Sequence, residues 1–214
     1  MTTQTPYTLK DVVSNEHAAL VVVDVQNDFC HQEGSLGKLV TDRTNLEQAV
    51  DHLVHLIEEA RRFHVPVVFI QTTHDRFNDS SVWLRARSDR PGGTQAAAVC
   101  ATGTWGAEFY KVKPRPDERI VNKHRFSAFI GTDLEMTLRT LKRESVLVTG
   151  VTTNVCVEST AREAFMREFH VVLVEDCASA WTVEEHQATV HNIGKYFGQV
   201  ADSQKLVALW SGEA

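Results

Sequence analysis

Three residues of different chemistry follow short stretches that are predicted to be strands in this sequence. Asp24 ends the run in VVVDVQNDF, Lys123 follows the stretch 119–122, and Cys156 comes soon after the run VLVTGV. A carboxylate can accept a proton, an ammonium can hold a carboxylate and a thiolate in register, and a thiolate can attack a carbonyl carbon. Together these groups could attack and hydrolyse an amide through a cysteine thiolate.

Each of the three residues also has an ordinary structural explanation. An Asp can cap the turn after a strand, a Lys can be a solvated surface charge, and a Cys can pack a helix onto a sheet. The catalytic interpretation depends on their shared position, because each lies at or just beyond the carboxyl end of a different predicted strand. In open parallel sheets ligands bind at that edge, so we predict that Asp24, Lys123 and Cys156 form one catalytic set.

The segment around Cys156 carries the strongest local signal. We expect a buried strand to break at Gly150, to turn through residues 152–154 and to enter a helix at about Cys156. At a helix N-terminus the macrodipole and the free backbone N–H groups favour a thiolate. The same N–H groups can receive the oxyanion of an attacked carbonyl, so one turn is expected to supply both nucleophile and oxyanion hole.

The apolar pattern predicts the elements that position these residues. Short β-branched runs alternate with amphipathic stretches, which indicates a parallel sheet with helices on both faces. The expected strands are Ala18–Asp24, Val65–Gln71, Ile120–Asn122, Val146–Thr149 and Val171–Val174. The predicted fold class is therefore α/β: a three-layer α/β/α, Rossmann-like fold with a parallel sheet of about six strands.

Capping patterns predict where three helices begin. Each pattern has a Thr three residues before a Glu and ahead of apolar residues at helical spacing. The pairs are Thr44 with Glu47, Thr132 with Glu135, and Thr182 with Glu185.

The periodicity of apolar residues fails between Arg76 and Pro116, which predicts a long connection that is either functional or a surface excursion. The sequence leaves open whether this connection is a lid.

Size and composition favour one domain and argue against several partners. The 214 residues are 43% hydrophobic and 23% charged, so residues 1–214 are expected to form a single domain with its core at about 18–206. A net charge of −6 without a basic stripe argues against nucleic acid. No apolar leader or membrane-spanning run occurs, which predicts a soluble cytoplasmic protein. Four widely spaced cysteines indicate neither a disulfide framework nor a structural zinc.

Four segments together resemble the isochorismatase-like cysteine hydrolases. This superfamily contains nicotinamidase, carbamoylsarcosine amidase, biuret hydrolase and ureidoacrylate amidohydrolase. The segments are VVVDVQNDF, GTWGAEF at 103–109, IVNKHRFSAF around Lys123, and TGVTTNVCVESTAREA around Cys156, and the similarity runs from about Ala18 to about Leu206. The resemblance implies an isochorismatase-type fold.

The resemblance also implies roles for particular residues. Asp24, Lys123 and Cys156 fall on the family's catalytic triad, and the Val151–Thr152 bond falls on its non-proline cis peptide. The backbone N–H groups of Thr152 and Cys156 would form the oxyanion hole. The expected activity is hydrolysis of the C–N bond of a small amide or ureide through a Cys thioester.

Departures from the family pattern narrow the expected chemistry. Nicotinamidases bind a divalent metal through an Asp-x-His motif after the second strand, whereas this chain has Thr72, Thr73 and His74 there. We therefore expect no required metal and no organic cofactor. Isochorismatase proper lacks the nucleophilic cysteine, so Cys156 favours an amide or ureide. The phrases NVCVESTAREA and RFSAF most resemble the ureidoacrylate, biuret and carbamoyl-amide branch.

The substrate contacts and the alternatives are less closely defined. Gln26 could hydrogen-bond a small amide or ureide substrate, and aromatic residues could wall the pocket or simply pack the core. These aromatic residues are Phe29, Trp105, Phe126 and Phe129. Arg76, Arg85 and Arg87 could pair with a substrate carboxylate, but the sequence singles out none. Relatives imply a homodimer or homotetramer. A nicotinamidase or isochorismatase-like hydrolase, and a catalytically silent binding or scaffold domain, remain alternatives.

Overall fold

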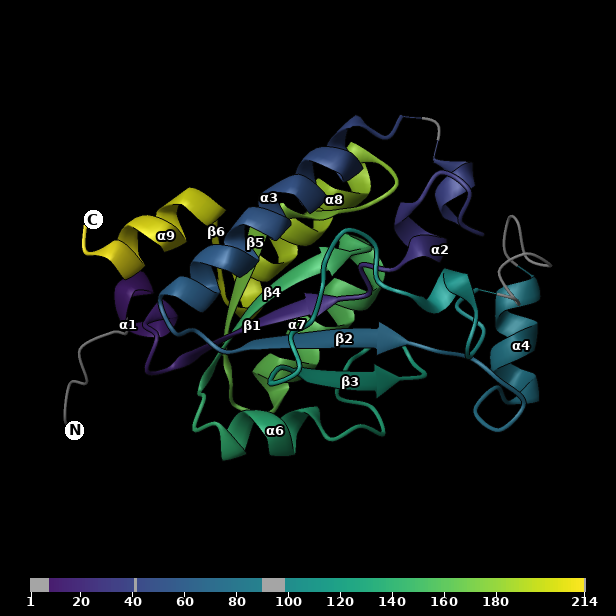
Figure 1. Ribbon diagram of the computed structural model, residues 1–214, viewed down its shortest axis with the longest axis horizontal. Helices are drawn as coiled ribbons and strands as arrows, with labels where there is room; N and C mark the ends of the chain where they lie inside the picture. The colour runs from purple at the N-terminus through teal and green to yellow at the C-terminus, as the bar shows by residue number, and fades with distance from the viewer. Residues whose placement is uncertain (1–7, 41, 90–98, 214) are drawn as a thin grey trace.

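The chain forms a six-stranded sheet in which every pair of neighbouring strands is parallel (Figure 1). The computed structural model describes residues 8–40, 42–89 and 99–213. The strand order is β3-β2-β1-β4-β5-β6, with β1 near the centre. The strands are β1 Ala18–Val23, β2 Val67–Thr72, β3 Arg119–Lys123, β4 Ser145–Val151, β5 His170–Ser179 and β6 Gln199–Ala201. The predicted α/β fold is confirmed, and β6 is the strand for which we predicted no position.

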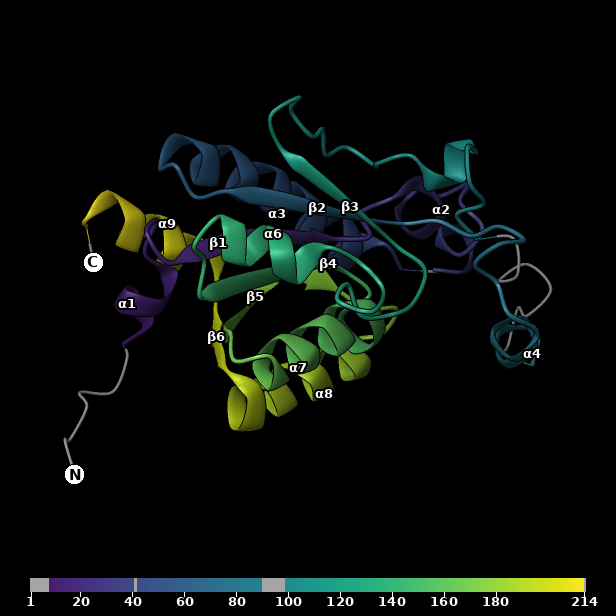
Figure 2. The same cartoon turned by 90° about the horizontal axis from the view of Figure 1, so that it is seen from below.

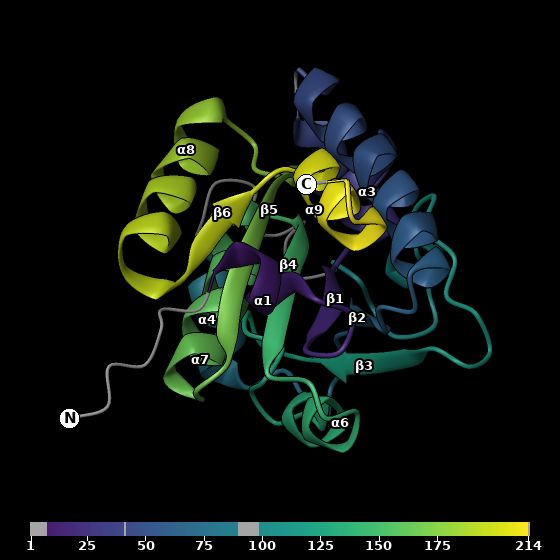
Figure 3. The ribbon, with the colours of Figure 1, turned by 90° about the vertical axis from the view of Figure 1, so that its left-hand side faces the viewer.

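Helices cover both faces of the sheet (Figure 3). The α-helices of the described residues, not all of which lie on a face of the sheet, are α1 Leu9–Val13, α2 Asn27–Cys30, α3 Thr44–Arg62, α4 Ser81–Ser88, α6 Leu134–Thr140, α7 Glu158–Met166, α8 Val183–Asn192 and α9 Ser203–Ser211. Alternate residues of β1 explain the two layers: Leu20 and Val22 join the core beneath α3 and α9, while Val21 and Val23 join the core beneath α6 and α7. Because both faces of β1 are covered, its sequence is a continuous apolar run.

The helix starts agree only in part with the capping patterns. At α8 the predicted box forms, since Thr182 Oγ1 accepts from Glu185 N at 3.2 Å and Glu185 Oε2 accepts from Thr182 N at 3.2 Å. At α3 the box is absent because Arg43 is the N-cap and Thr44 is already the first helical residue; the Glu47 carboxylate binds Arg43 at 2.8 Å and Lys111 at 2.9 Å. At α6 the N-cap is Asp133 rather than Thr132, and the predicted box is absent there too. The Thr-x-x-Glu pattern thus locates a helix start without identifying the residue that caps it.

Helix α4 is a second difference, because it lies inside the stretch predicted to be an irregular connection. Ser80 caps it by accepting a hydrogen bond from Trp83 N at 3.2 Å. Its only buried residue is Arg87, so the helix has no apolar stripe that a periodicity argument could detect. Figures 1 and 2 show α4 beyond the ends to which the strands point.

The end of β4 is shaped by close contact with β1. Gly150 has φ +103°, and a Cβ there would lie 2.0 Å from the Val23 carbonyl oxygen, so only glycine fits. Asp24, which directly follows Val23 at the end of β1, has φ +53°, a left-handed conformation that Asp tolerates better than most residues. The Val151–Thr152 bond is cis, as the resemblance implied. These features bring the ends of β1 and β4 together.

A partly buried ion pair ties α3 to the start of β3. Arg61 donates to both oxygens of Glu118, at 2.8 and 2.7 Å, and each side chain is only 10% exposed. Glu118→Gln is expected to lower the free energy of unfolding by about 2 kcal/mol, since it leaves the guanidinium without its best-buried partner. Urea denaturation measures this change.

Glu58→Gln is the matched control, because Glu58 binds the same arginine but its side chain is 56% exposed. This variant should cost no more than about 0.5 kcal/mol. Although burial raises the pKa of Glu118, hydrogen bonds from Arg61 outweigh it and the pKa is lowered. The Glu118 contribution should therefore fade as the pH falls below about 4. Equal losses in the two variants would contradict this account.

Among the described residues, we find no helix whose length and apolar character would let it cross a bilayer. The cytoplasmic location stays a prediction.

Candidate active site

Asp24, Lys123 and Cys156 lie together at the carboxyl edge of the sheet. Asp24 follows β1, Lys123 ends β3, and Cys156 lies in the turn after β4. Lys123 Nζ is 2.8 Å from Asp24 Oδ2 and 3.5 Å from Cys156 Sγ, and it also donates to Arg125 O at 2.9 Å. The ammonium thus has a partner for each of its three protons. The exposed fractions of Asp24, Lys123 and Cys156 are 0, 1 and 7%.

Burial and the charges within the cluster together set its ionisation. Burial raises the pKa of Asp24 although the Lys123 ammonium opposes the change. Burial alone would lower the pKa of Lys123, but the negative charge of Asp24 and the contacts of the ammonium with Asp24 and Cys156 outweigh it, and this pKa is raised. Burial and the Asp24 charge raise the pKa of the Cys156 thiol, which Lys123 only partly offsets. The resting site therefore holds an ammonium, a protonated thiol, and a carboxylate made more basic by its surroundings.

Cys156 lies in the first turn of a helix, as expected, but its ionisation differs from the expected one. The thiol lies in a π-helical turn, Thr153–Val157, which continues directly into α7 at Glu158. We expected a helix terminus to favour the thiolate, but the full burial of the sulfur has the larger effect. Attack on a carbonyl therefore requires the thiol to pass its proton to a neighbouring base as the new bond forms.

Cys156 and Lys123 open onto a cavity of about 200 Å³. Its other lining residues are Phe29, Leu36, Thr72, His74, Trp83, Arg87, Arg125, Phe126, Thr152, Val155 and Trp181. Of the predicted aromatic contacts, Phe29 and Phe126 line this cavity. Arg87 is the one of the three candidate arginines that reaches it.

The other predicted contacts lie elsewhere. Gln26 is buried, and its amide donates to Thr72 O at 2.9 Å and Ala107 O at 2.8 Å while accepting from Thr72 N at 2.8 Å. Both of its amide N–H groups are thus used in tying β2 to the loop at Ala107. Trp105 is half-exposed and stacks edge-on against His31, and Phe129 packs in the core against Phe169. None of these three lines the cavity.

Several lining residues were not recognised from the sequence as site residues. Trp83 comes from α4, Arg125 follows Lys123 by two residues, and Trp181 follows β5. The only available signal for Arg125 was its place in the segment IVNKHRFSAF. Arg87 is 8% exposed, whereas Arg85, on the same helix, is exposed, a distinction that depends on which way α4 faces.

The donor set near His74 does not fit the metal site of a nicotinamidase. Thr72 supplies a hydroxyl where that motif has a carboxylate, and this hydroxyl donates to Lys123 O at 3.2 Å. His74 Nδ1 is already paired with Asp79 Oδ1 at 2.7 Å. Within residues 8–40, 42–89 and 99–213 we find no group of three His, Cys, Asp or Glu side chains placed to hold a metal ion.

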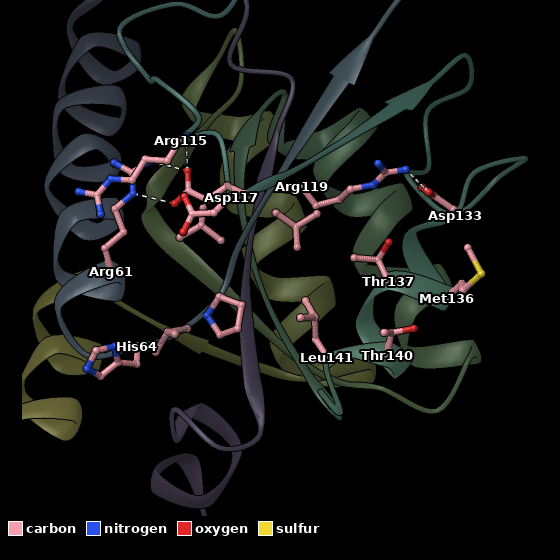
Figure 4. A pocket seen from close by; sticks show the side chains of 15 residues that line it. Arg61, His64, Arg115, Asp117, Arg119, Asp133, Met136, Thr137, Thr140 and Leu141 are labelled. Carbon is pink, nitrogen blue, oxygen red and sulfur yellow. Dashed lines mark hydrogen bonds and ion pairs between the residues drawn. The ribbon is translucent and has the colours of Figure 1, made fainter.

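A larger hollow of about 580 Å³ lies at the opposite end of β2 and β3 (Figure 4). Its three arginines are engaged in ion pairs, Arg61 with Glu118, Arg115 with Glu58, and Arg119 with Asp133. No cysteine lines it, and it lies at the amino rather than the carboxyl ends of the strands. The smaller cavity is therefore the candidate active site.

Comparison with known proteins agrees with this geometry. The family model described as the isochorismatase domain matches residues 18–205. The ureidoacrylate amidohydrolase of Variovorax paradoxus is 31% identical over 201 residues, which cover 89% of this chain and 80% of that protein. The structure of N-carbamoylsarcosine amidase from Thermoplasma acidophilum is 27% identical, with a TM-score of 0.70 over 87% of this chain and 96% of that chain.

A cysteine hydrolase from Pseudomonas syringae, 22% identical, shares the fold over the whole of both chains with a TM-score of 0.85. These matches confirm the resemblance carried by the four sequence segments. The domain match covers both the central sheet and the Asp24, Lys123 and Cys156 cluster. This chain therefore belongs to the isochorismatase family and has the fold of its hydrolases.

Proposed function

We propose that this protein hydrolyses the C–N bond of a small amide or ureide, with Cys156 as nucleophile and a thioester as intermediate. The observation that carries the proposal is the buried ammonium of Lys123, which lies between the Asp24 carboxylate and the Cys156 sulfur at the wall of a small cavity. The named relatives, a ureidoacrylate amidohydrolase and an N-carbamoylsarcosine amidase, support the same reaction class.

In the proposed mechanism, Asp24 takes the thiol proton while Cys156 Sγ bonds to the substrate carbonyl carbon. The backbone N–H groups of Thr152 and Cys156 stabilise the resulting oxyanion. Asp24 then gives its proton to the nitrogen as the C–N bond breaks, which leaves the thioester. A water molecule transfers a proton to Asp24 and attacks the thioester carbonyl, and Asp24 returns that proton to the departing sulfur. Lys123 remains an ammonium throughout and offsets the changing negative charge.

We further propose that the substrate carries a carboxylate. Two guanidinium groups, those of Arg87 and Arg125, line the cavity, and no acidic side chain of the described residues does so. Arg125 is held in place, since its Nη1 donates to Asn78 O at 3.1 Å and its guanidinium lies 4.8 Å from the centre of the Trp83 ring. A cavity of this volume suits a molecule of few heavy atoms, so a group bound at the arginines lies close to Cys156.

The direct test is ammonia release from biuret, N-carbamoyl amino acids, ureidoacrylate, nicotinamide and maleamate. We expect the fastest hydrolysis with a carboxylate-bearing ureide or amide. Arg87→Leu should raise KM for that substrate about 10- to 100-fold, because it removes a charged hydrogen-bond donor from a buried site. Arg85→Leu, on the exposed face of the same helix, should leave KM unchanged. A preference for uncharged substrates, or equal effects of the two variants, would contradict the carboxylate proposal.

We also propose that the chain forms a homodimer or homotetramer. Apolar side chains exposed around α7 support this, with Phe165 47% and Met166 70% exposed in the single chain. Light scattering coupled to gel filtration measures the assembly.

A further inference from the structure

His74 is a buried polar residue of the cavity that the proposed mechanism does not use. Its backbone N–H donates to Cys100 O at 3.0 Å, and its carbonyl accepts from Thr102 N at 3.0 Å. The imidazole ring stacks on Trp83 with 5.9 Å between ring centres and 23° between planes. The backbone of His74 is thus fixed and its ring packs on Trp83, and the residue shares the cavity wall with Cys156.

Asp79 determines which ring nitrogen of His74 carries the proton. Its Oδ1 lies 2.7 Å from His74 Nδ1, and both side chains are buried. An ionised carboxylate can only accept, so the proton of a neutral imidazole lies on Nδ1 and the lone pair on Nε2. Burial lowers the pKa of His74, the Arg87 charge lowers it further, and Asp79 only partly opposes them. The ring is therefore neutral at pH 7.

The Nε2 atom has no hydrogen-bonding partner in the part of the chain that the structure describes. Since Nδ1 faces Asp79, the opposite edge of the ring is the one available to a molecule in the cavity. The charged groups lining this cavity, on Lys123, Arg87 and Arg125, are all donors. His74 Nε2 supplies an acceptor among them.

We propose that His74 Nε2 accepts a hydrogen bond from an N–H of the substrate's reacting amide or ureide nitrogen, and so selects substrates that retain such an N–H. This inference rests on the proposed hydrolase function. A nitrogen held through one N–H by His74 can direct its developing lone pair towards protonated Asp24, which supplies the proton as the C–N bond breaks. His74 itself gains and loses no proton. It is a specificity-determining residue.

The test uses three forms of the N-carbamoyl amino acid that the wild type hydrolyses fastest. They are the primary ureide, its N′-methyl derivative, which retains one N–H, and its N′,N′-dimethyl derivative, which has none. Consumption of each compound is followed by proton NMR. The wild type should lose at least about tenfold in kcat/KM between the monomethyl and dimethyl forms, since the buried acceptor then has no partner.

Two variants replace the His74 ring with a side-chain amide that lies near the former position of a different ring nitrogen. His74→Asn keeps a polar group near the Nδ1 position but nothing at Nε2, and His74→Gln places an amide near Nε2. In His74→Asn the difference in kcat/KM between the monomethyl and dimethyl forms should shrink to about twofold. His74→Gln should retain part of that difference. Asp79→Asn can donate to Nδ1 and so move the ring proton to Nε2, which should also reduce the difference.

The outcomes separate this inference from the function on which it rests. If the wild type hydrolyses no N-carbamoyl amino acid in the series, both the inference and the hydrolase proposal for this substrate class are overturned. If it hydrolyses them but His74→Asn slows all three forms by the same factor, the function stands and the His74 role is wrong. A wild type without the monomethyl-to-dimethyl step also overturns the role.

Discussion

Cys156→Ala is expected to lower kcat by at least about 10⁴-fold while the protein stays folded, because it removes the nucleophile from a mechanism that proceeds through a covalent intermediate. Because the Cys156 side chain is small and lies beside a cavity, its truncation should disturb the surrounding packing little. Ammonia release measures the activity, and circular dichroism with thermal unfolding measures the fold.

Cys177→Ala is the matched control for this experiment. Cys177 is also a buried free thiol, in β5, but it does not line the cavity. Its variant should lose some stability and keep its activity. Undiminished hydrolysis by Cys156→Ala would sink the thioester mechanism, and a catalytically silent scaffold domain would show no difference between the two variants because neither would have activity to lose.

Lys123→Met is expected to have the second large effect, on both activity and stability. It leaves the Asp24 carboxylate fully buried without its cation, which should lower the free energy of unfolding by about 3 kcal/mol at pH 7. It should also lower kcat about 10³-fold, since charge in the transition state loses its buried electrostatic partner. Urea denaturation and steady-state kinetics measure the two losses.

The stability loss of Lys123→Met should depend on pH in a defined direction. Burial raises the pKa of Asp24, and in the variant the Lys123 ammonium that opposes this rise is gone. The folded variant therefore holds a proton on Asp24 that the unfolded chain releases above about pH 4. Its stability should be greatest below that pH and should fall as the pH rises towards the raised pKa of the folded state. The variant should thus be closer to the wild type at pH 5 than at pH 8.

A double variant separates the two roles of the ion pair. Asp24→Asn with Lys123→Met removes both charges, so much of the lost stability should return, while activity should not, because the proton acceptor is gone. A single Lys123→Met variant as stable as the wild type at pH 8 would show that the buried pair does not have the coupling described here.

The cluster of Asp24, Lys123 and Cys156 was predictable because it follows from local pattern and topology. Asp24 ends an apolar run, Lys123 follows a short predicted strand, and the carboxyl ends of parallel strands must meet at one edge. Gly150 was predictable as a break because a glycine interrupts the apolar run VLVTGV, whereas its contact with the Val23 carbonyl is known only from the structure. The predictable features depend on short segments and on the direction of the strands.

Gln26 and Arg87 were not predictable in the same way. A glutamine two residues after Asp24 has the right chemistry for a ureide, yet both N–H groups of its amide are bound by the backbone of two distant segments and its oxygen accepts from a third backbone group. Arg87 and Arg85 are equivalent in the sequence, and only the orientation of α4 buries the first and exposes the second. Neither result can be predicted from the neighbouring residues in the sequence, because each depends on residues far along the chain.

The amino-acid sequence by itself determined the parallel α/β fold, the family and the three residues that gather at one edge of the sheet, because apolar periodicity and strand direction are encoded in neighbouring residues. The tertiary structure decided the protonation of Cys156, the choice of Arg87 over Arg85, and the pairing of His74 with Asp79. Burial and charge act through space, so the pKa of a buried group depends on partners that its own segment does not contain.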